Sequence, residues 1–375
     1  MTRKDKILGL RVVLTGGGTG GHLFPGIAVA EALLTSFPSG KVMFIGTGRH
    51  IDNKTLAQRG FQVEAISCQG LKGKSIKAAI ASLWQLPWSL WQAIRLLREF
   101  KPVLVIGVGG YVTGPVMLAA RLLGKLTCIH EQNSIPGLAN RLIGGFVHRI
   151  FISLPGSERY FPAHKTIFTG NPVRRELVAL GARESLDAGM TLVVLGGSQG
   201  AHRINQLVTG ALSAVKDSLP ASFQVIHQTG ADDESWVRER YERMGICAEV
   251  AAFFNDMPRI YQEADLIVSR AGATTLAEIA VVGVAALLIP YPFAADDHQK
   301  MNALYLVEAG AAVMIIENQA REKELGLQLI ELFVKPELRR QMAAKAKSMG
   351  RPRATELIVE ECIGLLATKG YSFVS

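Results

Sequence analysis

The sequence predicts an α/β protein with two doubly wound parallel sheets, one in each half of the chain. In the first half, short apolar runs rich in Val and Ile alternate with stretches that have helical spacing. The same order restarts near residue 190, and a glycine-rich loop follows the first apolar run of each half. A length of 375 residues is that of two average domains.

Short buried strands are expected where an apolar run ends at a glycine-rich or polar segment. In the first half these runs are Val12–Leu14, Val42–Ile45, Val63–Ile66, Val103–Val108 and Thr127–His130. In the second half they are Leu192–Leu195, Phe223–His227, Ala248–Ala251, Leu266–Val268, Ala285–Ile289 and Ala312–Ile315. Because ligands bind at the carboxyl ends of parallel strands, the segments that follow these runs are candidate sites.

The segment Gly170–Arg174 has the composition of a loop and predicts a domain boundary. We therefore expect a first domain over residues 1–170 and a second domain over residues 171–351. The final helical run, Pro336–Leu366, is expected to pack back across the junction. Residues from about 352 to 375 are therefore assigned to the first domain.

The first glycine loop, Gly16–His22, lies between an apolar run and a helix expected at Phe24–Leu34. Glycines allow a ligand to approach the backbone, and the bare N–H groups at a helix start favour a phosphate. The loop matches the spacing of dinucleotide-binding folds, but the second strand ends in Gly46–Arg49 without the acidic residue that a ribose needs. It also resembles a tubulin-type nucleotide loop, and a sugar-nucleotide or phospholipid-sugar site is the third interpretation.

The net charge of +9 is unevenly distributed. Residues 1–175 hold 22 Lys and Arg against 7 Asp and Glu, whereas the remainder holds 19 against 25. This asymmetry predicts that the first half meets an anionic partner: nucleic acid, a membrane surface or a phosphorylated substrate. The four cysteines are scattered without a pairing pattern, which is typical of free thiols in a reducing compartment.

Two segments bear on a membrane. Pro102–Ala120 carries no charged residue, but its glycine-rich centre predicts a strand, a loop and a helix start instead of a membrane span. Trp84–Lys101 contains three of the four tryptophans, followed by basic residues, which suits the boundary of an anionic membrane. The alternative is a pair of helices packed on the sheet, with a break at Pro87. No secretory signal peptide is expected.

In the second half, Ser269–Glu278 follows an expected strand and opens a helix. A carboxylate at Glu278 can accept paired hydrogen bonds from ribose hydroxyls. The alternative is an acidic residue in the first turn that complements the helix dipole. Asp296 and Asp297 are adjacent and are expected to be solvated or to cap a helix, so no metal site is predicted.

Six motifs occur in order along the chain: Gly-Gly-Gly-Thr-Gly-Gly-His, Gly-Gly-Tyr-x-x-Gly-Pro, His-Glu-Gln-Asn, Gly-Asn-Pro-Val-Arg, Gly-Gly-Ser-Gln-Gly and His-Gln-x-x-Asn-Ala. With them the chain, from about Arg11 to the C-terminal helix, resembles the MurG family of bacterial undecaprenyl-diphospho-muramoylpentapeptide β-N-acetylglucosaminyltransferases. The resemblance implies a GT-B fold, in which two Rossmann-like domains face a cleft. It implies transfer of GlcNAc from UDP-GlcNAc to the C4 hydroxyl of MurNAc in lipid I, with inversion, to give lipid II.

The resemblance also assigns site residues. Glu278 would bind the ribose, Phe254 would lie near the uracil, and Ser198 and Arg174 would hold the UDP diphosphate. The rest of the donor pocket would be Asn133, Ala273, Thr274, Thr275, Leu276, Ala277 and Gln299. The lipid diphosphate of the acceptor would lie against Gly18, Thr19, Gly20, Gly21, Gly109, Gly110, Tyr111, Thr113 and Gly114.

An inverting transfer needs a base for the acceptor hydroxyl and stabilisation of the departing UDP. His22 is the first candidate for the base because its ordinary pKa suits neutral pH, and Glu131 is the second. His22 could equally order the loop or contact phosphate. Arg174 and the helix start after Gly196–Gly200 could stabilise the diphosphate, and no cofactor is expected.

The family implies a peripheral membrane protein on the cytoplasmic face of the bacterial inner membrane, with UDP-GlcNAc and lipid I as partners and no nucleic acid. Contacts with the cell-wall synthesis machinery are a further expectation. The alternatives are a glycosyltransferase acting on diacylglycerol, a UDP-GlcNAc 2-epimerase of the same fold, and a non-catalytic binding scaffold.

Overall fold

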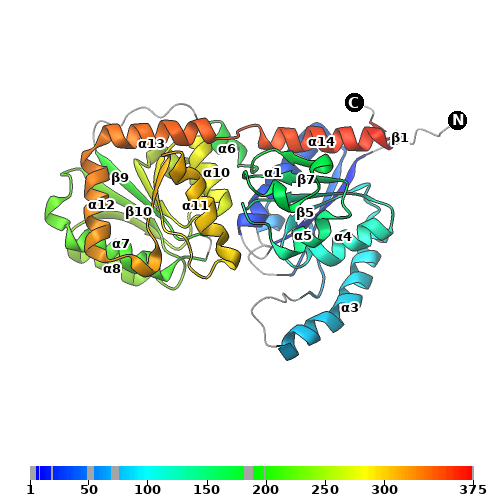
Figure 1. Ribbon diagram of the computed structural model, residues 1–375, viewed down its shortest axis with the longest axis horizontal. Helices are drawn as coiled ribbons and strands as arrows, with labels where there is room; N and C mark the ends of the chain where they lie inside the picture. The colour runs from blue at the N-terminus through cyan, green and yellow to red at the C-terminus, as the bar shows by residue number, and fades with distance from the viewer. Residues whose placement is uncertain are drawn as a thin grey trace. The chain divides into compact units, whose positions relative to one another are not determined.

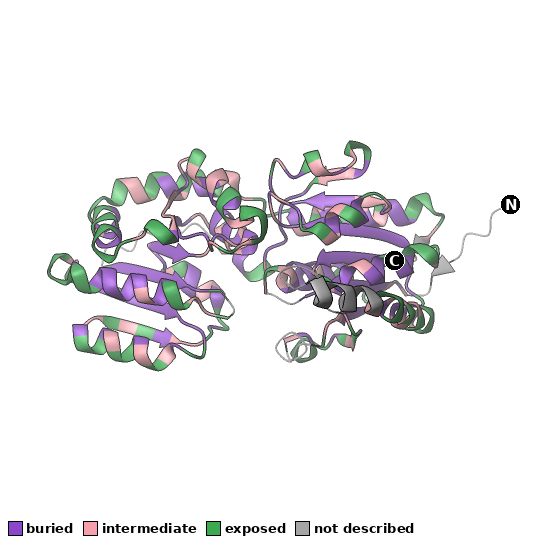
Figure 2. Ribbon diagram, turned by 60° about the horizontal axis from the view of Figure 1, so that its bottom comes forward, coloured by how far each residue is buried: buried purple, intermediate pink, exposed green. Residues whose placement is uncertain are grey.

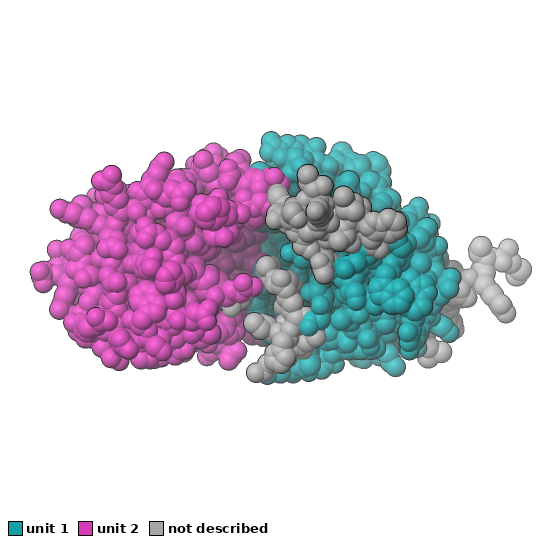
Figure 3. Space-filling view, turned by 90° about the horizontal axis from the view of Figure 1, so that it is seen from below, with its two compact units in different colours: residues 1–172, 353–375 teal, residues 173–352 magenta. Residues whose placement is uncertain are grey.

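The computed structural model describes residues 6–7, 9–17, 20–48, 55–68, 76–180, 189–197 and 199–373, with the backbone alone for 6–7, 76–84 and 372–373. The chain forms two compact units, coloured separately in Figure 3. Unit 1 comprises residues 1–172 and 353–375, and unit 2 comprises residues 173–352. Each unit is built on its own sheet.

Unit 1 contains a seven-stranded sheet in the order β4-β3-β2-β5-β6-β7-β8, and all its neighbouring strands are parallel. The strands are β2 (Arg11–Gly16), β3 (Lys41–Gly46), β4 (Gln62–Ala65), β5 (Leu104–Gly109), β6 (Leu126–Glu131), β7 (Arg149–Ile152) and β8 (Thr166–Phe168). A second, two-stranded sheet pairs β1 (Lys6–Ile7) with β15 (Ser372–Phe373), near the two ends of the chain. The apolar runs of β5 and β6 are buried throughout, as expected for central parallel strands that are covered on both faces.

Helices cover both faces of the unit 1 sheet (Figure 1). Helices α1 (Gly20–Ser36) and α14 (Ala354–Thr368) pack against each other and share one apolar core with the sheet. Helices α3 (Ile76–Phe100), α4 (Thr113–Leu122) and α5 (Leu138–Gly144) share the other core. Two short 3₁₀ turns, Glu158–Tyr160 and Ala163–Lys165, lie between β7 and β8.

Unit 2 contains a six-stranded parallel sheet in the order β11-β10-β9-β12-β13-β14. The strands are β9 (Met190–Leu195), β10 (Phe223–Gln228), β11 (Cys247–Ala251), β12 (Leu266–Ser269), β13 (Ala285–Leu288) and β14 (Ala312–Met314). The helices are α6 (Arg175–Val178), α7 (His202–Ala214), α8 (Glu234–Met244), α9 (Met257–Glu263), α10 (Ala273–Val282), α11 (His298–Glu308), α12 (Glu322–Val334) and α13 (Pro336–Met349). In both units the inner strands are buried, the edge strands β4, β8, β11 and β14 are partly exposed, and the helices expose their outer faces (Figure 2).

All eleven predicted strands are confirmed, and so is the two-sheet fold class. The prediction missed β7 and β8, two short strands at one side of the unit 1 sheet, and the two-residue strands β1 and β15. Pro102–Ala120 forms β5, a glycine loop and most of α4, as expected. In the part of the chain that is described, no helix is long and apolar enough to cross a bilayer.

Two helical predictions need correction. The final run, Pro336–Leu366, is two helices, α13 and α14, because Gly350 has extended backbone and Pro352 follows it. Helix α13 belongs to unit 2 and α14 to unit 1. Pro87 does not divide a helix pair: it lies inside the single helix α3.

Candidate functional site

Each sheet has one point where the strand order reverses, and that point is where doubly wound sheets bind ligands. In unit 1 the reversal lies between β2 and β5, and in unit 2 it lies between β9 and β12. The segments that leave these four strands are Gly16–Gly17, Gly109–Gly110, Gly196–Gly197 and Arg270–Gly272. The glycine-rich segments predicted as binding loops therefore lie at the two switch points.

In unit 1 the two glycine loops touch through their backbones. Gly110 has φ +88°, and a Cβ atom there would lie 2.7 Å from the carbonyl oxygen of Gly17. The hydroxyl of the fully buried Thr113 donates a hydrogen bond to the Gly109 carbonyl at 2.9 Å, so its side chain helps to hold the loop in this conformation. Gly18 and Thr19 lie outside the described residues. The result is a narrow backbone surface that glycine alone can form.

His22 lies in the first turn of α1, beside this surface. Its ring packs directly on Gly109, where φ is +103° and a Cβ atom would come within 2.8 Å of the imidazole. Its Nδ1 lies 3.0 Å from Oε1 of Gln132, the second residue after His130 in the His-Glu-Gln-Asn motif. Burial lowers the pKa of His22, and the hydrogen bond to Gln132 opposes that shift only in part. His22 is therefore a neutral imidazole near pH 7.

Glu131 has a different environment, which argues against its role as the base. Its side chain is 1% exposed, and its carboxylate accepts four hydrogen bonds. The donors are the backbone N–H and side-chain amide of Asn133, the backbone N–H of Gly137 and the amide of Asn140. Burial raises the pKa of Glu131, and these donors oppose the shift. These four hydrogen bonds tie the Glu131 carboxylate to the loop after β6.

The remaining predicted residues of unit 1 lie close to the same switch point. Gly20 and Gly21 form the start of α1, Tyr111 is half exposed after β5, and a Cβ atom at Gly114 would meet nothing within 4 Å. Asn133 is held by Glu131. Sequence reasoning missed Gln132 and His130 as site residues, although both belong to a motif that it had singled out.

In unit 2, Gln228 at the end of β10 connects the glycine loop to a predicted donor residue. Its side-chain amide donates to the Gly197 carbonyl at 3.0 Å, and its Oε1 accepts from the backbone N–H of Phe254 at 3.1 Å. The Phe254 side chain is buried in the core of unit 2. Ser198 lies outside the described residues. Gln228 was not predicted, and its polar position at the end of an apolar strand was the available signal.

Arg174, Tyr261 and Glu278 form a buried polar group in unit 2. Glu278 is 5% exposed; its Oε2 accepts from the Tyr261 hydroxyl at 2.9 Å, and its Oε1 lies 3.4 Å from Nε of Arg174. Burial raises the pKa of Glu278, and the Arg174 charge and the Tyr261 hydroxyl oppose the shift. Glu278 lies in the second turn of α10, and the first turn has no acidic residue, so the helix-dipole interpretation is wrong.

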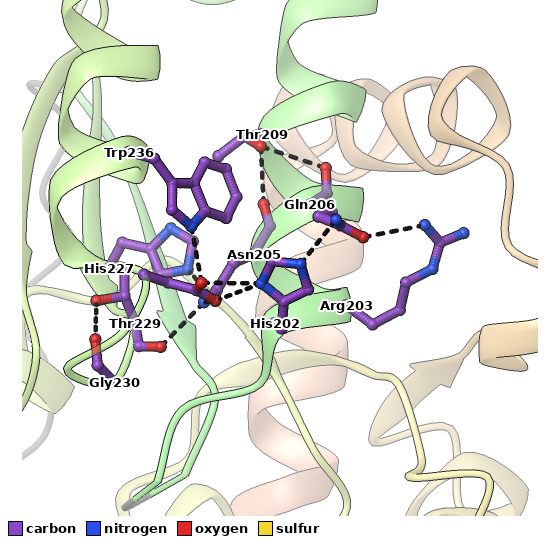
Figure 4. A network of polar contacts seen from close by, with 10 residues as sticks. His202, Arg203, Asn205, Gln206, Thr209, His227, Thr229, Gly230 and Trp236 are labelled. Carbon is purple, nitrogen blue, oxygen red and sulfur yellow. Dashed lines mark hydrogen bonds and ion pairs between the residues drawn. The ribbon is translucent and has the colours of Figure 1, made fainter.

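A larger polar network supports the start of α7 (Figure 4). His202 contacts Asp233 at 2.8 Å, and Asn205 donates to Asp233 and to the carbonyl of Thr229. The Asn205 carbonyl oxygen lies 2.9 Å from Nε2 of the buried His227. These contacts fix α7 against the loop after β10, next to Gly200.

The other predicted donor residues lie at the start of α10 and in the segment before α11. Leu276 is buried in the core, so its side chain packs the helix and does not face a ligand; Ala273, Thr274, Thr275 and Ala277 surround it on the first turns of α10. Gln299 accepts from the backbone N–H of Tyr291 at 3.0 Å. Asp296 and Asp297 are exposed before α11, and the described residues hold no group of three metal-ligating side chains.

Comparison with known proteins defines the class first. Residues 12–152 match the N-terminal domain of glycosyltransferase family 28, and residues 191–358 match its C-terminal domain. Two parallel sheets with these domains constitute the GT-B fold. A putative UDP-N-acetylglucosamine 2-epimerase from Listeria monocytogenes shares the fold with a TM-score of 0.68 over 98% of this chain and 100% of its own, at 13% identity.

Closer relatives define the family. The protein from Desulfotalea psychrophila named UDP-N-acetylglucosamine–N-acetylmuramyl-(pentapeptide) pyrophosphoryl-undecaprenol N-acetylglucosamine transferase is 46% identical over 95% of this chain and 97% of its own. The crystal structure of Acinetobacter baumannii MurG is 31% identical, with a TM-score of 0.77 over 94% of this chain and 98% of that one. The chain belongs to the MurG family of glycosyltransferases.

Proposed function

We propose that this protein transfers GlcNAc from UDP-GlcNAc to the C4 hydroxyl of MurNAc in lipid I, with inversion at the anomeric carbon, to give lipid II. The observation that carries the proposal is the identity of 46% to a relative with that name over 95% of the chain. The two switch-point sites support it, because a transferase has to bind a donor and an acceptor.

Unit 1 supplies the acceptor site in this proposal. The backbone surface of Gly16–Gly17 and Gly109–Gly110 would bind the diphosphate of the lipid, as glycine loops at a helix start do. His22 beside it would remove the proton from the acceptor hydroxyl as that oxygen attacks the anomeric carbon. A neutral imidazole next to the anion-binding loop has the protonation state that a general base requires.

Unit 2 supplies the donor site. Within the described part of the chain, Oε1 of Glu278 accepts no hydrogen bond, so it retains acceptor capacity for a ribose hydroxyl. Arg174, which contacts that oxygen, would also contact the UDP diphosphate, and the backbone N–H groups before α7 would do the same. These positive groups would stabilise the charge on UDP as it departs.

An apolar surface on unit 1 would bind the membrane. Trp88 and Trp91 of α3 are 53% and 49% exposed, and their rings stack with centroids 4.8 Å apart. Helix α4 packs between α3 and α5, and Leu118, Leu122, Leu138 and Leu142 on α4 and α5 are exposed too. Arg95, Arg98 and Arg121 on α3 and α4 are exposed cations. Exposed tryptophans beside cations favour an anionic lipid surface; the side chain of Trp84 lies outside the described residues.

The protein would act as a peripheral enzyme on the cytoplasmic face of the inner membrane, where UDP-GlcNAc is available. This location also allows contacts with the cell-wall synthesis machinery.

The reaction is tested with purified protein, radiolabelled UDP-GlcNAc and a short-chain lipid I analogue, beside diacylglycerol and a control without acceptor. We expect label on the lipid I analogue alone. Label on diacylglycerol would identify the protein as a glycolipid synthase and contradict the proposal. ManNAc formation without acceptor would identify it as an epimerase.

Membrane binding is tested by co-sedimentation with phosphatidylglycerol vesicles and with phosphatidylcholine vesicles. We expect a preference for the anionic vesicles that the Trp88→Glu and Trp91→Glu variants lose. Leu327→Glu, at an exposed apolar position on α12 in unit 2, is the matched control and should bind normally. Equal binding to both vesicle types would contradict the proposal.

A further inference from the structure

A hydrogen-bonded chain of side chains runs from the candidate base into the interior of unit 1. His22 on α1 contacts Gln132, Gln132 contacts His130 at the end of β6, and His130 contacts Ser153 just after β7. The distances are 3.0, 3.1 and 2.9 Å. Gln132, His130 and Ser153 are all buried, whereas His22 is half-buried and lies at the glycine loops.

The hydrogen atoms in this chain can be assigned from the inner end. The pKa of His130 is lowered to about 4, chiefly by burial, so His130 is neutral in any ordinary assay. Its Nε2 faces the carbonyl oxygen of Gly170 at 3.4 Å and the Ser153 hydroxyl at 2.9 Å. A carbonyl oxygen can only accept, so Nε2 carries the hydrogen and Nδ1 of His130 is an acceptor.

That assignment fixes the orientation of the Gln132 amide. Its NH₂ group donates to Nδ1 of His130 at 3.1 Å and to the Val108 carbonyl at 2.8 Å. Both hydrogens are then used by two acceptors that cannot reverse their roles. The Oε1 atom is left facing Nδ1 of His22, and an amide oxygen can only accept.

We propose that Gln132 is a positioning residue for the transfer reaction: it holds His22 in the tautomer with hydrogen on Nδ1, which leaves the lone pair on Nε2 for the acceptor hydroxyl. This inference rests on the proposed function. The same role, fixing the tautomer and orientation of a catalytic imidazole, belongs to the aspartate of Ser-His-Asp triads. A neutral amide orients the ring and raises its pKa less than a carboxylate would.

The ring has little freedom to leave this orientation. Gly109 packs directly on its face, where a Cβ atom would come within 2.8 Å. The groups that act on the charge of His22 are the Gln132 amide, the Val108 carbonyl of β5 and His130 of β6. Of these only His130 titrates, and it stays neutral above about pH 4.

The inference is tested with two variants that separate orientation from charge. Gln132→Met keeps the length of the side chain and removes all three hydrogen bonds. We expect kcat to fall about a hundredfold, because general-base catalysis depends on the correct tautomer, with KM for UDP-GlcNAc within about twofold of wild type. Gln132→Glu places a carboxylate against Nδ1 of His22 and should raise the pKa of that histidine.

The distinguishing readout is the acidic limb of the pH profile of kcat. In Gln132→Glu it should move to higher pH by about one unit or more, and in Gln132→Met it should not move upward. A residue that merely supports the fold would lower kcat equally in both variants and leave the limb in place, and that result would overturn the inference. Far-UV circular dichroism and thermal unfolding identify any variant that fails to fold.

A double-mutant cycle provides the second test. On a His22→Ala background, Gln132→Met should cost less than twofold, because the histidine that it positions is already absent. Independent, multiplicative effects would overturn the inference. Failure of the proposed function is distinguished by the wild-type protein, which would then transfer no GlcNAc to the lipid I analogue. In that case, ¹⁵N NMR of His22 still decides the tautomer, which should change from Nδ1–H in the wild type to a mixture in Gln132→Met.

Discussion

The two units share one scaffold and differ in what they place at its switch point. In unit 1 the candidate site is built around a neutral imidazole, His22, held by an amide. In unit 2 it is built around an ion pair, Arg174 with Glu278, and a tyrosine hydroxyl. A neutral base suits proton transfer from a hydroxyl, and charged groups suit the fixed binding of a nucleotide diphosphate. The sheet therefore fixes where a site lies, and a few side chains decide its chemistry.

Buried glutamates show the same contrast. Glu131 of unit 1 has four hydrogen-bond donors from its own loop, whereas Glu278 of unit 2 has one donor and one cation from distant parts of the chain. Within the described residues, the Glu131 carboxylate therefore has no acceptor position left for a ligand, whereas the Glu278 carboxylate has one at Oε1. Under the proposed function, Glu278 can therefore bind a ligand through the unsatisfied part of its carboxylate, and Glu131 cannot.

The largest effect is expected at His22. Because it would be the base, His22→Ala should lower kcat about 10²- to 10⁴-fold while KM for UDP-GlcNAc changes little. In the wild type, kcat should fall as pH decreases through the pKa of His22, and that pKa lies below 6.5 because the ring is buried. Steady-state kinetics between pH 5 and 9 measure both. An unchanged kcat in His22→Ala would show that His22 is not the base, and unit 1 would then no longer differ from unit 2 by supplying one.

Buried histidines provide a comparison in which both units should behave alike. The pKa values of His130 in unit 1 and His227 in unit 2 are lowered to about 4 and about 3, chiefly by burial. Below pH 6.5 the unfolded chain binds a proton at each histidine and the folded chain does not, so stability is lost as pH falls. The loss should reach about 2.5 kcal/mol per histidine at pH 4.5.

Scanning calorimetry at pH 7.0 and 4.5 measures that loss. His227→Gln should reduce the pH dependence, and His164→Gln, at an exposed position, should leave it unchanged. Equal pH dependence in all three proteins would show that these histidines take up protons in the folded state.

A smaller effect, on the free energy of unfolding, is expected at Glu131. Glu131→Gln turns an NH₂ group toward donors, so it should destabilise the protein by about 1–3 kcal/mol. Its kcat should remain well above that of His22→Ala. Urea unfolding and initial rates give the two values, with Glu158→Gln at an exposed site as control. A kcat as low as that of His22→Ala, with unchanged stability, would restore Glu131 as the base.

The fold was predictable because it depends on local patterns. Strands and turns can be predicted from a few neighbouring residues: an apolar run such as Leu192–Leu195 predicts a strand, and the glycine loop that follows it predicts a turn. Strands β7 and β8 have only four and three residues, but the equally short β12, β13 and β14 were predicted, so length alone does not explain why these two were missed.

The site was predictable in part, for a related reason. The motifs indicated His22, Glu131 and Glu278, but the contacts that assign their roles join residues far apart in the chain. His22 and Gln132 are separated by 110 positions. Only the Glu131 loop is local, and its contacts within nine residues are what a sequence could have revealed.

The most direct test of the division of work between the units is calorimetric titration of UDP-GlcNAc into three proteins: wild type, His22→Ala and Glu278→Gln. The account predicts that His22→Ala binds the donor within about twofold of wild type although transfer is lost, and that Glu278→Gln binds it about tenfold more weakly. Donor affinity that falls in His22→Ala as much as in Glu278→Gln would contradict it, because the histidine would then belong to the nucleotide site.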